Sequence, residues 1–408
     1  MFKSTRSFAR PIVIALTATI SFLCVNTAAQ AEIVRIEIKD VAPAFGGKSF
    51  GTVGKYDLIK ARAYGEVDPG DAHNASIADI ELAPVNARGK VEYSTDVEIL
   101  RPANVANGNH RLFFEVLNRG NKLALGNFND APSGNELLTP EMAGSGFLFE
   151  RGYTVVWAGW QSGKNVAAGK GRLMAQIPEA HSKNGGSLTG QIIMSQIFNN
   201  MQDSKIPLLF AVADRQARAN KVLIRNNSTS KPVELPHGAW TFVDDFNVKI
   251  DRSHTFLADY DAGAQYDVIY TAKDPDVSGL GYAITRDIVS FLKNNETDNN
   301  PLAGSLHYAL AHGTSQSGRM LKGFIHDGFN EDETGRVVFE GVNPNISGAH
   351  SIVLNERFGD ANATGRAYER HANAAIEFPF TYGSMKDPLT EKTDGILVNC
   401  SQSNTCPK

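Results

Sequence analysis

Hydrophobic and polar positions alternate along the first stretch that follows residue 31. The segment from Ile33 to Ile38 alternates, and the segment from Val91 to Ile99 does so again. A period of two is typical of half-buried β-strands. Turn-forming clusters such as Asp68-Pro69-Gly70 separate these segments. We therefore predict a β-rich N-terminal region over residues 32–108, which has no catalytic cluster of its own.

Beyond residue 109 the apolar runs become continuous. Short continuous runs at 112–117, 152–158, 308–311 and 378–382 predict buried strands, whereas 284–292 and 320–325 have helical spacing. Buried strands that alternate with helices are typical of an α/β fold, in which a mostly parallel sheet is covered on both faces. We expect this core to occupy residues 109–408.

The alternation of strands and helices is interrupted between about residues 161 and 278. Strand-like pieces at 221–225 and 266–270 are separated there by polar turns such as Asn226-Asn227-Ser228. This pattern predicts a large, partly β insertion, which would form a lid or a wall of a substrate cleft.

Residues 1–31 have the three parts of a secretory signal. Three basic residues precede an apolar run over residues 11–25, and Ala29-Gln30-Ala31 follows it. A basic start, a short apolar middle and an A-x-A end predict cleavage before Glu32. An uncleaved anchor is the alternative, but spanning a bilayer takes roughly 20 apolar residues. We expect a periplasmic or secreted protein with no stable membrane insertion after cleavage.

Composition narrows the possible functions. The 408 residues include 40 Lys and Arg against 44 Asp and Glu, with 42% hydrophobic and 21% charged residues. These proportions are typical of a globular protein and exclude a disordered, collagen-like or coiled-coil chain. The formal charge of −4 provides no positive excess for binding nucleic acid, and loss of the signal would make the chain more acidic.

Cysteine, histidine and glycine spacings predict no metal and no cofactor. Cys24 would leave with the signal, and Cys400 and Cys406 could then close a small disulfide loop or remain free thiols. No Cys-x-x-Cys or His-x-x-x-His pair is present in the sequence. Gly279-Leu280-Gly281 lacks the third glycine of a dinucleotide-binding fingerprint.

The most informative motif is His312-Gly313-Thr314-Ser315-Gln316-Ser317-Gly318-Arg319. It lies between the apolar run 308–311 and the helical run 320–325. A strand, a tight turn of small residues and a helix form the context of a nucleophile elbow, in which a serine stands on a strained turn. The spacing predicts that Ser315 is the nucleophile and that the N–H of Gln316 stabilises an oxyanion.

Two neighbouring features bear on this prediction. Ser317 is a rival nucleophile because it also precedes a glycine, but its register places Arg319 where the elbow needs a small residue. A second oxyanion donor is expected in the loop after an earlier strand, and Asn118 and Arg119 follow the run 112–117. An ordinary glycine turn at Asn118-Arg119-Gly120 is the alternative interpretation.

A serine nucleophile also needs a histidine base and an orienting acid, in the chain order Ser, acid, His. Asp387 follows the predicted strand 378–382 and is the first candidate acid, with Asp394 second and Glu377 third. No histidine follows Asp387 in the sequence. We interpret the histidines nearest to the motif as packing or surface residues rather than as the base. They are His312, His326, His350 and His371. We expect a C-terminally truncated hydrolase that lacks its base.

Several blocks of residues, in order from about residue 50 onward, are similar to those of one known family. They are Gly65-Glu66-Val67-Asp68-Pro69, Glu115-Val116-Leu117-Asn118-Arg119-Gly120-Asn121-Lys122, Gly159-Trp160-Gln161, Gly313-Thr314-Ser315-Gln316-Ser317-Gly318-Arg319, Gly328-Phe329-Asn330-Glu331-Asp332-Glu333 and Phe378-Pro379-Phe380-Thr381-Tyr382. The chain resembles the bacterial secreted alpha/beta-hydrolase domain-containing proteins. This resemblance implies an alpha/beta-hydrolase-like core and Ser315 as the nucleophile, and it implies no particular substrate.

These observations together predict an exported serine hydrolase that acts on small-molecule carboxylic esters. The missing base predicts that this chain is weakly active or inactive. It also motivates an alternative, a non-catalytic extracytoplasmic ligand-binding protein on a hydrolase scaffold. A peptidase or amidase is a further alternative, because amide cleavage uses the same nucleophile and the same oxyanion hole.

Overall fold

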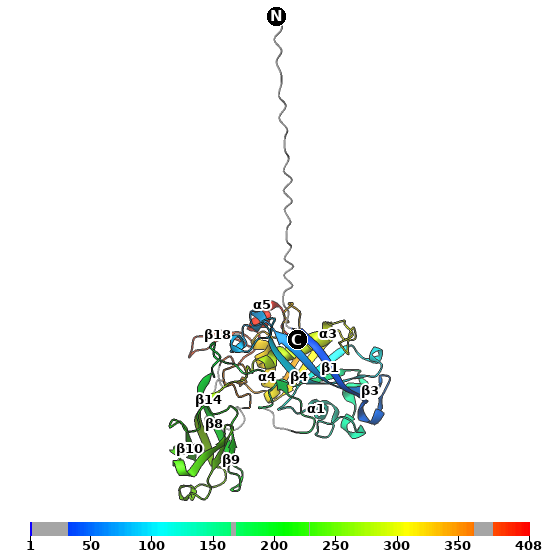
Figure 1. Ribbon diagram of the computed structural model, residues 1–408. Helices are drawn as coiled ribbons and strands as arrows, with labels where there is room; N and C mark the ends of the chain where they lie inside the picture. Colours follow the sequence, from blue (N-terminus) through cyan, green and yellow to red (C-terminus); the bar gives the residue numbers. More distant parts are fainter. Residues whose placement is uncertain (2–31, 165–168, 228, 363–377) are drawn as a thin grey trace.

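A computed structural model describes residues 1, 32–164, 169–227, 229–362 and 378–408. The predicted signal therefore lies outside the described residues, apart from Met1. Figure 1 shows a main body and a smaller lobe, drawn in green, that projects from it.

One mixed sheet forms the centre of the main body. In the described part of the chain it contains nine strands, in the order β1-β3-β4-β6-β5-β15-β16, with β2 paired to β3 and β7 paired to β4. The bounds are β1 (Glu32–Pro43), β2 (Ser49–Phe50), β3 (Gly54–Val67), β4 (Val91–Pro102), β5 (Arg111–Val116), β6 (Thr154–Ala158), β7 (Ala175–Gln176), β15 (Tyr308–Thr314) and β16 (Gly341–Asn345). Strands β6, β5, β15 and β16 run parallel. The continuous apolar runs predicted the first three of these strands, whereas β16 was not predicted.

The N-terminal strands extend this sheet. Strands β1, β3 and β4 pair antiparallel, and β4 pairs antiparallel with β6 between Val97–Leu100 and Val155–Ala158. These N-terminal strands join the central sheet through the pairing of β4 with β6. The alternating pattern of these segments predicted where the strands lie in the sequence. It did not predict which neighbouring strand each of them pairs with.

Helices cover both faces of the parallel strands. On one face α4 (Gln316–His326) packs on β15, β16 and β5, and α3 (Leu280–Asn294) contacts α4 through the rings of Tyr282 and Phe324. On the other face α1 (Ala124–Asn129) packs Phe128 against Phe113 of β5. Both predicted helices, 284–292 and 320–325, are confirmed. The shorter helices are α2 (Phe147–Glu150) and α5 (Val398–Ser403).

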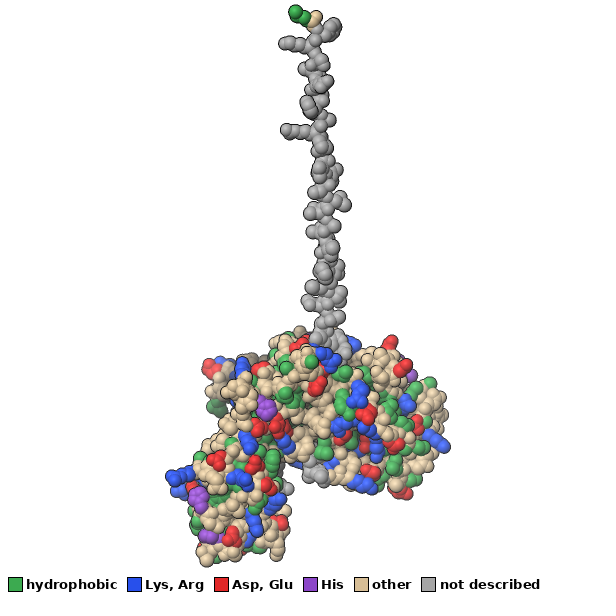
Figure 2. All heavy atoms as spheres, viewed as in Figure 1, with side chains coloured by type: hydrophobic (Ala, Val, Ile, Leu, Met, Phe, Trp, Pro, Cys, Tyr) green, Lys and Arg blue, Asp and Glu red, His purple; other side chains and the backbone are tan. Residues whose placement is uncertain are grey.

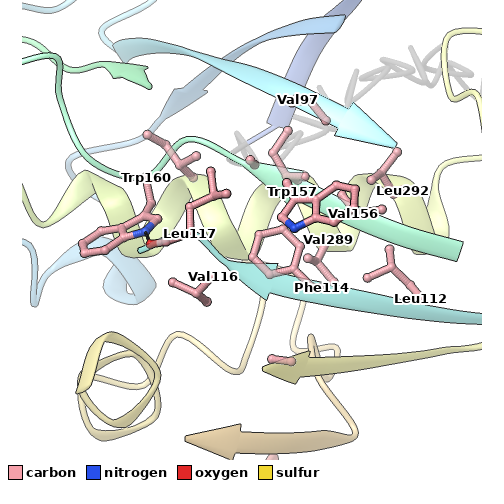
Figure 3. Packing of buried hydrophobic residues seen from close by; sticks show 14 of the residues in the cluster. Val97, Leu112, Phe114, Val116, Leu117, Val156, Trp157, Trp160, Val289 and Leu292 are labelled. Atoms are coloured by element: carbon pink, nitrogen blue, oxygen red, sulfur yellow. Dashed lines mark hydrogen bonds between the residues drawn. The ribbon is translucent and has the colours of Figure 1, made fainter. Parts of the chain in front are cut away.

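The core of the main body lies between these layers. Figure 3 shows Phe114 and Val156 of the central strands packed beside Val289 and Leu292 of α3. The indole of Trp157 is fully buried, and so is the side chain of Phe114, which is 1% exposed. Successive strand residues point to opposite faces, so that Phe113 and Phe114 reach the two helical layers from one strand.

The projecting lobe has a hydrophobic core of its own, built around residues such as Val222, Val248 and Tyr266. Its strands form a four-stranded sheet of order β11-β10-β14-β8 and a three-stranded sheet of order β12-β13-β9 in the described residues. The bounds are β8 (Thr189–Ile197), β9 (Lys205–Pro207), β10 (Lys221–Arg225), β11 (Val233–Glu234), β12 (Trp240–Asp244), β13 (Asn247–Ile250) and β14 (Gln265–Lys273). The strand-like segments predicted at 221–225 and 266–270 are confirmed.

The predicted strand at 378–382 is wrong. Residues 378–384 contain bends and no strand, and the nearby described strands are β17 (Met385–Lys386) and β18 (Thr393–Asp394), which form a short hairpin. The carbonyls of Thr381 and Tyr382 accept hydrogen bonds from Ile396 and Leu397 instead of a ladder partner. Phe380 and Tyr382 are 45% and 48% exposed, so their apolar pattern marks a surface loop.

Two further predictions concern covalent and membrane features. Cys400 and Cys406 are joined by a disulfide, which confirms the first of the two alternatives for these residues. Among the described helices, none has the length and apolar character to cross a membrane. Figure 2 shows basic and acidic side chains interspersed over the visible face.

The central strands predict a large cost for truncating a buried side chain. Leu112 lies in β5 and is 0% exposed, whereas Leu389 lies in the turn between β17 and β18 and is 91% exposed. We expect Leu112→Ala to lower the free energy of unfolding by about 2–5 kcal/mol. Leu389→Ala, the matched control, should change it by less than about 0.5 kcal/mol. Equal urea midpoints for the two variants would contradict this assignment of the core.

Candidate active site

Ser315 stands on the bend that joins β15 to α4. Its backbone has φ 59° and ψ −110°, a left-handed conformation that is rare outside glycine and costs about 1–3 kcal/mol. The N–H of Ser315 donates to the carbonyl of Asn345 at the end of β16, at 2.9 Å. Its own carbonyl accepts from the N–H of Arg319, at 3.0 Å. The predicted strand, tight turn and helix are confirmed, and Ser315 is partly exposed.

The bend needs glycine on both sides, and we name residues 313–318 the elbow. A Cβ atom on Gly313 would lie 2.4 Å from the carbonyl oxygen of Ser317. A Cβ atom on Gly318 would lie 2.9 Å from the carbonyl oxygen of Gly313 and 3.0 Å from that of Asn345. Contacts below 3.0 Å to backbone cannot be relieved by a rotamer change, so the elbow closes only because these positions carry no side chain.

The rival serine faces the interior. Ser317 is 0% exposed, and its hydroxyl donates to the carbonyl of Leu117 at 3.0 Å. The hydroxyl is therefore used to join α4 to the end of β5. Ser315 is the serine of the motif that solvent reaches.

The first turn of α4 provides backbone donors next to Ser315. Gln316 is the first helical residue, and the leading N–H groups of a helix have no carbonyl partner within the helix. The 11-residue helix also directs the positive end of its dipole at Ser315. The side chain of Gln316 is fully buried and donates to the carbonyl of Ala361 at 2.8 Å and to the amide oxygen of Asn362 at 2.6 Å.

The loop after β5 lies against the elbow, as predicted. The side-chain amide of Asn118 donates to the carbonyl of Thr314 at 2.9 Å. The backbone N–H of Asn118 donates to the carbonyl of Asn121 at 3.0 Å, within the loop. Asn118 thus positions the loop with its side chain and uses its own N–H internally. Arg119 follows in a left-handed conformation, with φ 50°.

A buried charged cluster under this loop was missed by the sequence analysis. Lys122 forms an ion pair with Glu98 at 2.8 Å, and the two side chains are 1% and 6% exposed. Glu115 accepts from the N–H of Leu123 at 2.7 Å and from the indole N–H of Trp157 at 2.5 Å. Burial raises the pKa of Glu115 to about 7 and lowers the pKa of Lys122. The signal available was a glutamate inside the apolar run Leu112–Leu117.

The candidate acids lie in the C-terminal hairpin. Asp387 is partly exposed and accepts from the N–H of Thr390 at 3.0 Å and from its hydroxyl at 2.5 Å, and these hydrogen bonds lower the pKa of Asp387. Its predicted position at the end of a sheet strand is wrong, because residues 378–382 form no strand. Its role as the orienting acid stays a prediction. Asp394 contacts His326 at 3.3 Å and Lys392 at 2.9 Å, and Glu377 lies outside the described residues.

The described histidines near the motif have other partners than Ser315. His312 is 2% exposed on β15, its Nε2 lies 3.1 Å from the hydroxyl of Thr314, and burial lowers its pKa to about 4. His326 lies between Asp327 at 3.0 Å and Asp394 at 3.3 Å. His350 is exposed, and His371 lies outside the described residues. In the part of the chain that the structure describes, no histidine is hydrogen-bonded to Ser315.

No metal centre is present among the described side chains. No group of three or more His, Cys, Asp or Glu residues in the described ranges could hold a metal ion. The candidate site is therefore an arrangement of a strained serine, backbone donors and a helix terminus.

A partly exposed serine on a strand–turn–helix bend, at the end of a parallel strand in a mixed sheet, is an arrangement of the alpha/beta-hydrolase class. A family model described as alpha/beta hydrolase domain matches residues 229–383. This match supports the alpha/beta hydrolase family and indicates hydrolase activity in general. The matched residues include the elbow and the second half of the lobe. Neither a curated protein nor a solved structure matches the chain.

The close contacts of Gly313 predict a cost for adding one methyl group at the elbow. We expect Gly313→Ala to lower the free energy of unfolding by about 1–3 kcal/mol, because the new Cβ would overlap the carbonyl of Ser317. Gly383→Ala is the matched control, since a Cβ there would meet nothing within 4 Å. Urea denaturation measures both changes. A Gly313→Ala protein as stable as the control would refute the tight elbow.

The two carboxylates around His326 predict a pH dependence. The hydrogen bond to Asp327, with a smaller contribution from Asp394, raises the pKa of His326. The charged ring therefore stabilises the fold below the unfolded pKa of about 6.5, and this contribution is lost as the pH rises through the folded pKa. We expect the parent protein to lose its stability advantage over His326→Gln between about pH 6 and 8. Urea midpoints across that range measure it, with exposed His350→Gln as control. Parallel curves for parent and His326→Gln would contradict it.

Proposed function

We propose that this protein is an exported serine hydrolase that cleaves carboxylic esters with Ser315 as its nucleophile. The observation that carries the proposal is the partly exposed Ser315 on a left-handed bend at the N-terminus of α4. A strained turn that projects a serine hydroxyl away from a buried strand is the geometry that nucleophilic attack on a carbonyl requires.

The proposed reaction has two stages. The acyl group is first transferred from the ester to Ser315 and then from Ser315 to water. The Ser315 oxygen bonds to the ester carbonyl carbon, and the carbonyl oxygen becomes negatively charged. The N–H of Gln316 and the N–H of Arg119 in the loop after β5 stabilise this oxyanion, aided by the dipole of α4. Collapse of the intermediate breaks the bond to the alkoxide oxygen, which leaves as the alcohol with the proton that Ser315 loses, and an acyl group remains on Ser315. Water then attacks this acyl group, one proton of the water returns to the Ser315 oxygen, and the acyl group leaves as a carboxylic acid.

The proton of Ser315 needs an acceptor, and this limits the expected rate. Of the described histidines near the elbow, His312 contacts Thr314, and His326 contacts Asp327 and Asp394. A serine without a contacting histidine keeps only the acceleration from oxyanion stabilisation and binding, roughly 10³–10⁴-fold over water. We therefore propose slow turnover for this chain.

Export is part of the proposal. Its support is the signal-like sequence of residues 1–31 and the disulfide between Cys400 and Cys406, since disulfides persist in oxidising compartments. The proposed location is the periplasm or the exterior of the cell.

The engagement of the described histidines also favours one alternative, a ligand-binding protein on a hydrolase scaffold. Amide cleavage is the other alternative, because it would use the same hydroxyl and the same donors.

A fluorophosphonate probe separates these functions. We expect slow covalent labelling at Ser315 and slow hydrolysis of 4-nitrophenyl butyrate, because oxyanion stabilisation assists attack on phosphorus as well as on the ester carbonyl. Ser315→Ala should remove the label and lower ester hydrolysis by about tenfold or more. Peptide mass spectrometry locates the label.

Ser317→Ala is the matched control and should keep both the label and the turnover, because its hydroxyl is buried against Leu117. Labelling of the Ser315→Ala protein at the parent's level would overturn the assignment. A parent protein that takes no label would favour the ligand-binding alternative.

A further inference from the structure

We propose that Glu115 is a positioning residue for the reaction at Ser315, because its buried carboxylate fixes the loop 118–123 that carries the proposed oxyanion donor of Arg119. This inference rests on the proposed function, since it concerns the same reaction. The side chain of Glu115 does not touch the reacting atoms. It acts on them through the backbone of the loop.

The loop is attached to the elbow where it leaves β5. The side-chain amide of Asn118 donates to the carbonyl of Thr314 at 2.9 Å. The carbonyl of Leu117 accepts from the hydroxyl of Ser317 at 3.0 Å. The start of the loop is therefore hydrogen-bonded to residues on both sides of Ser315, and the position of the loop is defined relative to the nucleophile.

Glu115 holds the other end of the same loop. Its Oε1 accepts from the N–H of Leu123 at 2.7 Å, and Leu123 directly precedes α1. This hydrogen bond joins the end of the loop to the strand from which the loop starts. Between the two anchors Asn118 and Asn121 exchange two backbone hydrogen bonds of 3.0 Å. The turn that they close contains Arg119, so the position of the Arg119 N–H depends on both anchors.

The surroundings of the Glu115 side chain suit an ionised carboxylate. Its Oε2 accepts from the indole N–H of Trp157 at 2.5 Å, so an N–H group faces each of its two oxygens. Backbone and indole N–H groups only donate, and an ionised carboxylate accepts at both oxygens. A protonated carboxyl group or a glutamine amide carries hydrogen at one of these two positions. Either would weaken one of the two hydrogen bonds and release the loop.

The charged groups around Glu115 come from the loop and from neighbouring strands. Lys122 in the loop lowers the pKa of Glu115 and forms an ion pair with Glu98 of β4 at 2.8 Å. His312 of β15 is aligned with Glu115 in the sheet, and burial lowers its pKa to about 4, so its ring is neutral near pH 7. Two further side chains influence the pKa of Lys122, namely Lys60 and Glu136.

Ionised Glu115 costs stability, and this separates a positioning role from a folding role. Burial, the largest influence, raises the pKa of Glu115 from its usual value of 4.5 to about 7. The contribution of Glu115 to stability is therefore fully present below about pH 4.5 and is lost as the pH rises through about 7. Activity should change in the opposite direction, because the carboxylate that holds the loop forms over the same pH range.

The first test compares Glu115→Gln with the parent protein in the hydrolysis of 4-nitrophenyl butyrate between about pH 5.5 and 8.5. We expect the kcat of the parent to rise with a midpoint near the pKa of Glu115. Glu115→Gln should lack this midpoint and have a kcat about tenfold lower at about pH 8. KM should change by less than about threefold, because oxyanion donors act in the transition state.

Urea midpoints of the same two proteins provide a readout that a purely structural role would not produce. We expect any stability advantage of the parent over Glu115→Gln to shrink between about pH 5.5 and 8, while its advantage in kcat grows. A kcat advantage and a stability advantage that rise and fall together would contradict the positioning role.

Glu234→Gln is the matched control, because Glu234 is exposed on the lobe, and it should keep the kcat and the pH profile of the parent. Trp157→Phe removes one donor to the carboxylate and should move the midpoint to higher pH, since the hydrogen bond from Trp157 lowers the pKa of Glu115. This variant keeps the test usable if Glu115→Gln does not fold. A parental kcat and pH profile in Glu115→Gln, with hydrolysis still dependent on Ser315, would overturn the inference and leave the proposed function standing.

Hydrogen exchange tests the position of the loop without turnover. At about pH 8 we expect residues 118–123 to exchange about tenfold faster in Glu115→Gln than in the parent, with parental rates in the strands of the lobe. The difference should shrink at about pH 5.5, where the Glu115 side chain is itself protonated. Equal exchange of the loop in both proteins at the higher pH would overturn the inference even if the protein hydrolyses no ester.

Discussion

The hydrogen bond from the N–H of Ser315 to the carbonyl of Asn345 is the contact on which the site depends. It extends the parallel pairing of β15 and β16 by one residue and holds Ser315 in a left-handed conformation before α4 begins. Gly313 and Gly318 make the bend possible because they leave room for neighbouring carbonyls. Once the bend exists, the position of Ser315 and the direction of α4 follow.

Local features were the ones that the sequence could predict. The strand 308–311, the small residues of the elbow and the helix 320–325 are adjacent in sequence, so pattern and geometry agree. The segment 378–382 has an equally apolar pattern but forms no strand. Nothing in its residues distinguishes a buried strand from a surface loop whose carbonyls bond to Ile396 and Leu397. Burial is decided by tertiary contacts, which an apolar run does not contain.

Contacts between residues far apart in the chain could not be predicted from the sequence. Asn118 and Thr314, or Lys122 and Glu98, meet only because β5 lies between β6 and β15 in the sheet. A buried lysine and a buried glutamate next to the same loop also restrict how it can move, since separating such partners in a dry interior is costly. The shape of the candidate oxyanion loop therefore depends on charges that no motif indicated.

The way in which the lobe is attached to the main body determines how its length can vary. The chain leaves the main body at Leu188 and returns at Asp274, whose N–H donates to the Leu188 carbonyl at 3.0 Å. Entry and exit thus lie side by side, and the intervening strands enclose a separate hydrophobic cluster. A segment with these properties can be lengthened or shortened while the strand order beneath the serine stays the same.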